Sequence, residues 1–172
     1  MARRCRLLPQ GYAHHVFNRG NKRQVLFREP QDYLNFLALM VRAERRHVVG
    51  LLAYCLMPNH FHLVVRPSTA AELPAYMHWL TSTHVRHTQR RYGTVGEGHL
   101  YQARYKNIVI ITDLQLITVC RYVESNPLTA GLVSRAEDWP YSSLGRPSGI
   151  GPTLADWPLP KPANWAELVN TA

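Results

Sequence analysis

The chain has 172 residues, of which 46% are apolar, so it is long enough to form one globular domain with its own core. Its 20 Lys and Arg residues against 11 Asp and Glu give a formal net charge of +9, which favours a polyanionic partner such as nucleic acid. We expect no signal peptide or membrane span, and the widely spaced Cys5, Cys55 and Cys120 argue against a zinc ribbon and favour a reduced, cytoplasmic protein.

The hydrophobic periodicity along the chain predicts four strands and three helices. The predicted elements are, in order, a strand at residues 12–18, a helix from Pro30 to the basic cluster at 42–47, strands at 48–56 and 60–66, a helix at 71–91, a strand at 105–111, and a helix from 113 to about 125. The turn at residues 57–59 makes the second and third strands a hairpin. Asp113 is the predicted N-cap of the last helix, and Asn126-Pro127 is its predicted end.

This order of elements predicts the fold class α+β, with a ferredoxin-like sandwich. The sheet is expected to be mostly antiparallel, with helices on one face and Tyr122 on the last core helix. We expect one domain at residues 1–145. Residues 146–172 form a Pro-rich tail that is either packed on this domain or extended away from it.

The first chemical feature is the pair of histidines in His60-Phe61-His62. Side chains at i and i+2 of a strand point to the same face, so the two imidazoles project together and Phe61 points to the other side. Two neighbouring imidazoles make a natural half of a metal site. The competing interpretation is a pair of histidines on a solvated strand face.

The second feature is Tyr122 with Asn126, which share one helix face because they are four residues apart. A tyrosine hydroxyl can serve as a covalent nucleophile, and an amide oxygen can complete a metal shell of two histidines and waters. Taken alone, this pair is more typical of packing and capping at a helix end.

The third feature is a set of basic residues interleaved with tyrosines, which is typical of a surface that tracks phosphates and stacks unpaired bases. A generic basic surface is the competing interpretation for any single residue. The tyrosines in this set are Tyr92, Tyr101 and Tyr105. The cations that we expect to contact phosphates are Arg19, Lys22, Arg23, Arg104 and Lys106.

Three segments occur in an order that resembles the single-tyrosine HUH transposases, specifically the REP-associated tyrosine transposases of the IS200-like group. These are MPNHFHLV at 57–64, GHLYQARYK at 98–106 and YVESNPLTAGLV at 122–133. The segments HHVFNRGN at 14–21 and DWPYSS at 138–143 are also similar to that branch. The resemblance covers roughly residues 11–145, and the tail lies outside it.

The resemblance implies a role for each matching residue. His60 and His62 would ligate a divalent metal, Mg²⁺ or Mn²⁺, with Asn126 as the polar third ligand and Tyr122 as the nucleophile. It also implies binding to single-stranded DNA with imperfect hairpins, nicking beside them, and DNA transposition or REP-element mobilisation. Dimers that exchange a tyrosine helix occur in the wider family, so both a monomer and a dimer are open.

The mechanism that follows as a hypothesis is an in-line attack by Tyr122 on phosphorus, which gives a 5′-phosphotyrosine and a free 3′-hydroxyl. No nucleotide cofactor is expected, since the chain lacks a GxxxxGK[ST] loop. Tyr105 and Tyr141 are the alternative nucleophiles. The competing functions are a catalytically silent single-stranded nucleic-acid-binding protein of the same fold, a metal-dependent RNA or phosphoester hydrolase, and a structural protein with chance histidines.

Overall fold

The computed structural model describes residues 11–171, so Cys5 lies outside the described part, whereas Cys55 and Cys120 are buried free thiols. Its elements are β1 (Ala13–Arg19), the 3-10 turn η1 (Asn21–Arg23), α1 (Pro30–Glu44), β2 (Val49–Met57), β3 (His60–Pro67), α2 (Glu72–Tyr92), β4 (Lys106–Ile110), α3 (Asp113–Thr129), η2 (Ala136–Asp138) and α4 (Trp165–Asn170). Within the described part, no helix is both long and apolar enough to cross a membrane.

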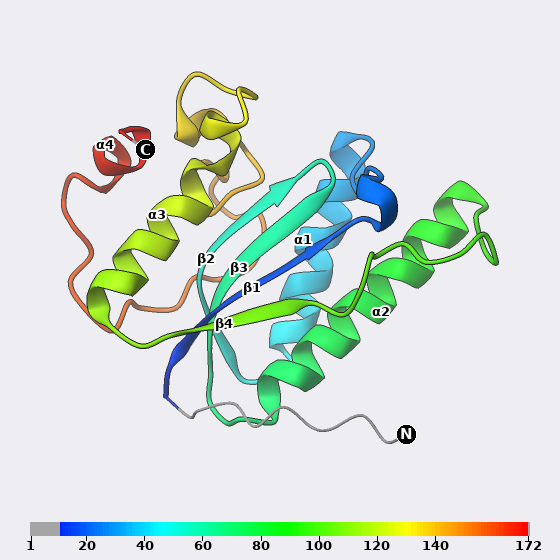
Figure 1. Ribbon diagram of the computed structural model, residues 1–172, viewed down its shortest axis with the longest axis horizontal. Coiled ribbons are helices and arrows are strands. Elements are labelled where there is room, and N and C mark those ends of the chain that lie inside the picture. Colours follow the sequence, from blue (N-terminus) through cyan, green and yellow to red (C-terminus); the bar gives the residue numbers. More distant parts are fainter. Residues whose placement is uncertain (1–10, 172) are drawn as a thin grey trace.

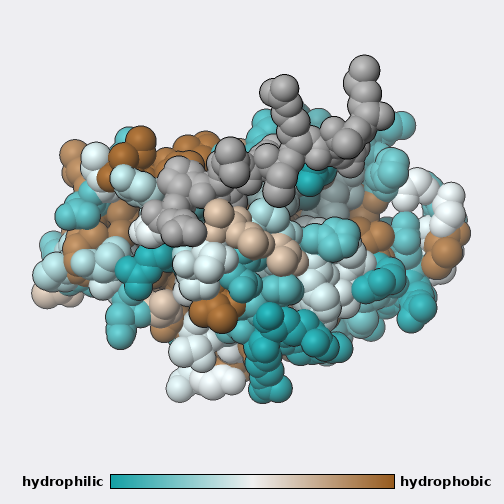
Figure 2. All heavy atoms as spheres, turned by 90° about the horizontal axis from the view of Figure 1, so that it is seen from below, coloured by the Kyte–Doolittle hydropathy of each residue, from teal (hydrophilic) through white to brown (hydrophobic). Residues whose placement is uncertain are grey.

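The four strands form one antiparallel sheet in the order β2-β3-β1-β4. Because α1 and α2 each connect two strands that are not neighbours and both lie on the same side, this is a ferredoxin-like arrangement (Figure 1). The predicted α+β class and antiparallel sheet are confirmed. On the face drawn in Figure 2, side chains are mostly polar and the apolar ones lie in separate patches.

The prediction that the helices lie on one face of the sheet is wrong. Helices α1 and α2 cover one face, and α3 and α4 lie on the other side (Figure 1). The reason is that β2 is apolar on both faces. Leu51, Tyr54 and Leu56 pack towards α1 and α2, whereas Cys55 and Met57 pack with α3.

Helix α3 also begins and ends differently from the prediction. Its N-cap is Thr112, not Asp113, and the Thr112 hydroxyl accepts a hydrogen bond from the backbone N–H of Gln115 in a capping box. The helix passes through Pro127 and ends at Thr129. Pro127 is buried and lies only two residues from the helix end, where packing outweighs the single hydrogen bond that a proline cannot donate.

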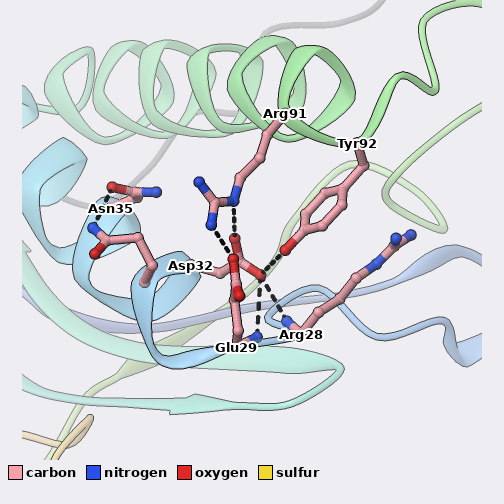
Figure 3. Close-up of polar contacts among 7 residues, drawn as sticks. Arg28, Glu29, Asp32, Asn35, Arg91 and Tyr92 are labelled. Carbon is pink, nitrogen blue, oxygen red and sulfur yellow. Dashed lines mark hydrogen bonds and ion pairs between the residues drawn. The ribbon is translucent and has the colours of Figure 1, made fainter.

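A polar cluster joins the start of α1 to the end of α2 (Figure 3). The buried Asp32 carboxylate accepts hydrogen bonds from the backbone N–H groups of Arg28 and Glu29, and from the Tyr92 hydroxyl at 2.6 Å. Arg91 forms ion pairs with both Asp32 and Glu29. These contacts hold α1 and α2 together on the face of the sheet opposite to His60 and His62.

The residues after α3 pack on the domain. Tyr141 and Ser143 hydrogen-bond through their backbones to β2, and Leu154 forms a bridge with Leu51 of the same strand. Helix α4 then lies against α3, with Trp165 and Val169 buried beside Cys120 and Val123. The tail therefore covers the outer edge of β2 and the back of α3.

Candidate active site

The two site histidines, His60 and His62, project from β3 towards α3, as the alternation of the strand predicts. Their ring centroids are 5.0 Å apart, and Phe61 between them is fully buried against α1, with its ring 5.2 Å from that of Phe36. The Pro58 carbonyl of the preceding turn accepts hydrogen bonds from the backbone of Leu26 and Phe27. This anchored turn fixes the start of β3, where the first imidazole is attached.

Helix α3 presents Tyr122 to these imidazoles. Its neighbours Val123 and Glu124 are fully buried, whereas the Tyr122 side chain is 52% exposed on the side that faces β3. The Tyr122 ring centroid lies 5.6 Å from that of His62 and 6.0 Å from that of His15. A phenol and two imidazoles of one chain therefore meet on one face of the sheet.

Asn126 follows one helical turn after Tyr122. Its amide nitrogen donates to the Tyr122 carbonyl at 2.7 Å, which ties the amide to the backbone of its own helix. Its side chain also forms a hydrogen bond with His60. The structure thus brings together all four residues that were singled out as nucleophile and metal ligands: His60, His62, Tyr122 and Asn126.

A third histidine completes the cluster. His15 lies on β1 next to β3, and its Nε2 is 2.8 Å from the Nδ1 of His62, so one ring nitrogen donates and the other accepts. His60 is held in the same way, with its Nδ1 2.7 Å from the Asn59 side-chain oxygen. The Nδ1 atoms of His62 and His60 are thus held by His15 and Asn59, and the second ring nitrogen of each histidine is Nε2.

The site keeps its imidazoles neutral. Burial lowers the pKa of His62 to about 2, assisted by the nearby His15, His60 and Arg19. Burial also lowers the pKa of His15 to about 4. The pKa of His60 is lowered by burial and by Arg19, with the Asn126 hydrogen bond opposing the shift. Neutral imidazoles have the lone pair that metal ligation requires.

The residues present fit a divalent cation. Two neutral imidazoles and one amide oxygen form a mixed nitrogen and oxygen set, and metal-ligating histidines commonly use their second ring nitrogen for an orienting hydrogen bond. Within residues 11–171, no three His, Cys, Asp or Glu side chains are grouped to hold a metal. A cation here would therefore depend on Asn126, or on oxygens of the substrate and water, for its further ligands.

A cavity of about 820 Å³ opens beside Tyr122 over the β1 and β4 side of the sheet. Three of the cations expected to contact phosphates line it: Arg19, Arg104 and Lys106. The other two, Lys22 and Arg23, lie on the exposed turn η1 outside this lining, where both have positive φ values of 50° and 62°.

Besides Tyr122 and the histidines, the cavity has one further aromatic lining residue, Phe17, which the sequence patterns did not single out. Of the interleaved tyrosines, Tyr101 is buried with its hydroxyl on His84, and Tyr92 is bound to Asp32. Tyr105 lines a separate hollow beside α2. Those three tyrosines therefore do not form the expected stacking surface at the site.

Neither alternative nucleophile lines the cavity at the histidines. Tyr141 stacks on Tyr33 with ring centroids 3.9 Å apart, within the core that α1 and α2 form on the opposite face. Tyr105 contributes to the hollow beside α2. Among the candidate tyrosines, Tyr122 is the one whose ring contacts the site histidines.

Comparisons with known proteins identify the family of this chain. Residues 8–126 match the family described as "Transposase IS200 like". That match covers more than half of the chain, so the chain belongs to the IS200-like transposase family.

Within this family, the chain is similar to REP-associated tyrosine transposases. A Haemophilus influenzae protein described as such is 25% identical over 124 residues, which cover 67% of this chain and 70% of the relative. A solved REP-associated tyrosine transposase bound to a REP hairpin has the same fold, with a TM-score of 0.67 at 17% identity. That alignment covers 92% of this chain and 96% of the solved one. The predicted family is confirmed.

Proposed function

We propose that this transposase is a metal-dependent endonuclease for single-stranded DNA, which nicks and rejoins strands beside hairpins through a 5′-phosphotyrosine on Tyr122. The observation that carries the proposal is the meeting of Tyr122 with His60 and His62, with 5.6 Å between the Tyr122 and His62 ring centroids. All three belong to the same chain. Hairpin substrates follow from the similarity to the transposase that was solved with a REP hairpin.

The reaction consists of two transesterifications. In the first, the Tyr122 phenol oxygen forms a bond to phosphorus, the bond to the 3′ oxygen breaks, and the phenol proton is balanced by the proton gained by the released 3′-hydroxyl. In the second, another 3′-hydroxyl attacks the same phosphorus and releases the phenol. The number of phosphodiester-type bonds is unchanged, so no nucleotide is consumed.

The remaining residues hold and neutralise the reacting phosphate. His60, His62 and Asn126 would hold a divalent cation, with His15 and Asn59 orienting the two imidazoles. When bound, such a cation supplies polarisation and placement of the scissile phosphate. Arg19, Arg104 and Lys106 line the adjacent cavity and offset the negative charge of the incoming strand.

The test is formation of a covalent adduct between the protein and a labelled hairpin oligonucleotide with single-stranded extensions, in the presence of Mn²⁺. We expect the wild-type protein to become linked to the 5′-phosphate product, and Tyr122→Phe to form no adduct while it still binds the oligonucleotide. Tyr141→Phe and Tyr105→Phe are the matched controls and should react normally.

Three other outcomes decide against the proposal. Cleavage without any protein-linked product, undiminished in Tyr122→Phe, would identify a hydrolase that uses water. Binding without cleavage by the wild-type protein would identify a silent nucleic-acid-binding protein. An adduct that persists in Tyr122→Phe and disappears in Tyr105→Phe or Tyr141→Phe would move the nucleophile.

A further inference from the structure

Within residues 11–171, no helix covers the part of the sheet face beside Tyr122 that β1 and β4 form. Helix α3 packs mainly over β2, so the β1 and β4 side of the same face is left open. There the Ile108 side chain is 55% exposed, and Phe17 is half-buried. The Phe17 ring lines the same cavity as His60 and His62. It has no role in the two proposed transesterifications.

The strand register places this ring between a site histidine and a cation. Phe17 pairs directly with His62 on one neighbouring strand and with Lys106 on the other. Directly paired residues of antiparallel strands point to the same face, so the three side chains form a row across β3, β1 and β4. The Phe17 ring centroid is 5.5 Å from that of His62 and 5.8 Å from the Lys106 Nζ.

We propose that Phe17 is a stacking platform for one unpaired nucleobase that adjoins the scissile phosphate, with Lys106 binding the phosphate beside that base. The inference rests on the proposed function, because it takes the phosphate to lie at Tyr122 and the site histidines. The single strand would then cross the sheet from β3 towards β4, perpendicular to the protein strands. The ligand that Phe17 and Lys106 together bind is one unpaired nucleotide of this strand.

The chemistry of the row selects this occupant. Phe17 offers a π-face and no hydrogen-bonding group, so it can bind any base by stacking and reads no sequence. Lys106 and Arg104, which line the same cavity, match the charge of the backbone on either side of such a base. A base stacked on Phe17 would also shield the neighbouring imidazole from water.

A purely structural role for Phe17 is the competing explanation, since its ring also lies 5.1 Å from that of His15. The two roles separate in Phe17→Leu, which keeps an apolar side chain beside His15 but removes the aromatic face. Phe17→Trp and Phe17→Tyr keep that face. Val95→Ala is the control, because Val95 is 70% exposed and lies in the loop after α2.

The experiment measures binding of hairpin oligonucleotides with single-stranded extensions, in which one abasic site is moved through the extension. Each protein carries Tyr122→Phe, so that binding is measured without reaction. With Phe17 present, we expect one abasic position to weaken binding roughly 5- to 150-fold, the equivalent of removing one base stack. The same position should have almost no effect in Phe17→Leu, and Phe17→Trp should restore the effect.

The proposal is overturned if the abasic substitution and Phe17→Leu weaken binding independently, so that their effects multiply at every position, or if no abasic position matters. Circular dichroism and the melting temperature of each variant confirm that it is folded. Adduct formation is tested separately, in the protein that retains Tyr122. A position-specific abasic effect together with no adduct in that protein would support stacking and refute the proposed function. Adduct formation without any position-specific abasic effect would refute stacking and leave the proposed function intact.

Discussion

The imidazoles of His15 and His62 are joined by a contact of 2.8 Å between Nε2 and Nδ1, although 47 residues separate them in sequence. The contact fixes the ring orientation of His62 and couples its tautomer to that of His15, and the other ring nitrogen of His62 is Nε2. Outer partners of this kind hold metal-ligating histidines in place in many proteins. His15 is therefore a positioning residue for the proposed metal site.

The first prediction concerns metal binding. His60→Ala combined with His62→Ala should abolish both Mn²⁺ binding and metal-dependent cleavage, because two of the proposed ligands are removed. His15→Ala should retain the ligands but weaken Mn²⁺ binding by roughly 10- to 100-fold, as loss of an orienting partner does elsewhere. Titration of Mn²⁺ followed by electron paramagnetic resonance measures both effects without requiring activity.

His87→Ala is the matched control, because this histidine is exposed on α2. It should bind Mn²⁺ as the wild-type protein does. Cleavage by the double variant in the presence of a chelator would contradict a metal role for these histidines.

The second prediction concerns the dependence of DNA binding on salt. Replacing Arg19, Arg104 or Lys106 by Ala should reduce the slope of log K against log salt concentration by about 0.7 for each phosphate of single-stranded DNA that the protein no longer neutralises. Lys22→Ala and Arg23→Ala test the second group of expected phosphate-binding residues, on η1. Arg45→Ala, just after α1, serves as the control. Unchanged slopes in all three cavity variants would show that the strand does not enter the cavity.

Patterns of local spacing predicted the central features of the site. Alternation along β3 placed His60 and His62 together with Phe61 on the opposite face, and helical spacing placed Tyr122 and Asn126 on one side of α3. These features depend only on the repeat of the element that carries them. The ferredoxin-like order of strands and helices was predictable for the same reason.

Relationships between distant strands could not be read in this way. The row formed by His62, Phe17 and Lys106, and the contact of His15 with His62, depend on register between strands far apart in sequence. The face of the sheet to which α3 would pack was also undetermined, because an apolar helix stripe does not specify which apolar surface it covers. A continuous apolar strand such as β2 was the available signal that both faces are covered.

The third prediction concerns the C-terminal segment. The buried Glu124 carboxylate accepts hydrogen bonds from Trp165 and Ser143, and Arg121 donates to the Leu168 carbonyl at 2.7 Å. These contacts flank Tyr122 on α3. Trp165→Ala should lower the free energy of unfolding by about 3–5 kcal/mol, because it removes a buried ring and leaves Glu124 short of a donor.

Hydrogen exchange distinguishes a local effect from a global one. In Trp165→Ala, we expect amides of α3 to exchange faster, while those of α1 and α2 keep their relative protection. Lys161→Ala is a milder control at the same surface, where the lysine amine lies 5.2 Å from the Trp165 ring centroid. Unaltered exchange in α3 would show that the tail does not restrain the tyrosine helix.

The fourth prediction concerns stability in acid. His84 is buried between Phe27 and Phe36, and its Nδ1 is 2.6 Å from the Tyr101 hydroxyl oxygen. Burial, with a smaller effect of His87, lowers the pKa of His84 from 6.5 to about 3, against an opposing effect of Asp32. The folded state therefore keeps this imidazole neutral at a pH where the unfolded chain protonates it.

Lowering the pH destabilises the folded state, because the unfolded chain then binds an extra proton at His84. Above pH 6.5 both states hold His84 neutral, and between pH 6.5 and about 3 the unfolded state binds one more proton, so stability falls as the pH is lowered. His84 alone lowers the unfolding free energy by at most about 1.4 kcal/mol for each pH unit, and other buried histidines add similar losses. His84→Gln should make the slope of unfolding free energy shallower by up to this amount between pH 6 and 5, whereas His78→Gln, at an exposed position of the same helix, should not. Equal slopes in wild type and His84→Gln, measured by urea unfolding at each pH, would mean that His84 can be protonated in the folded core.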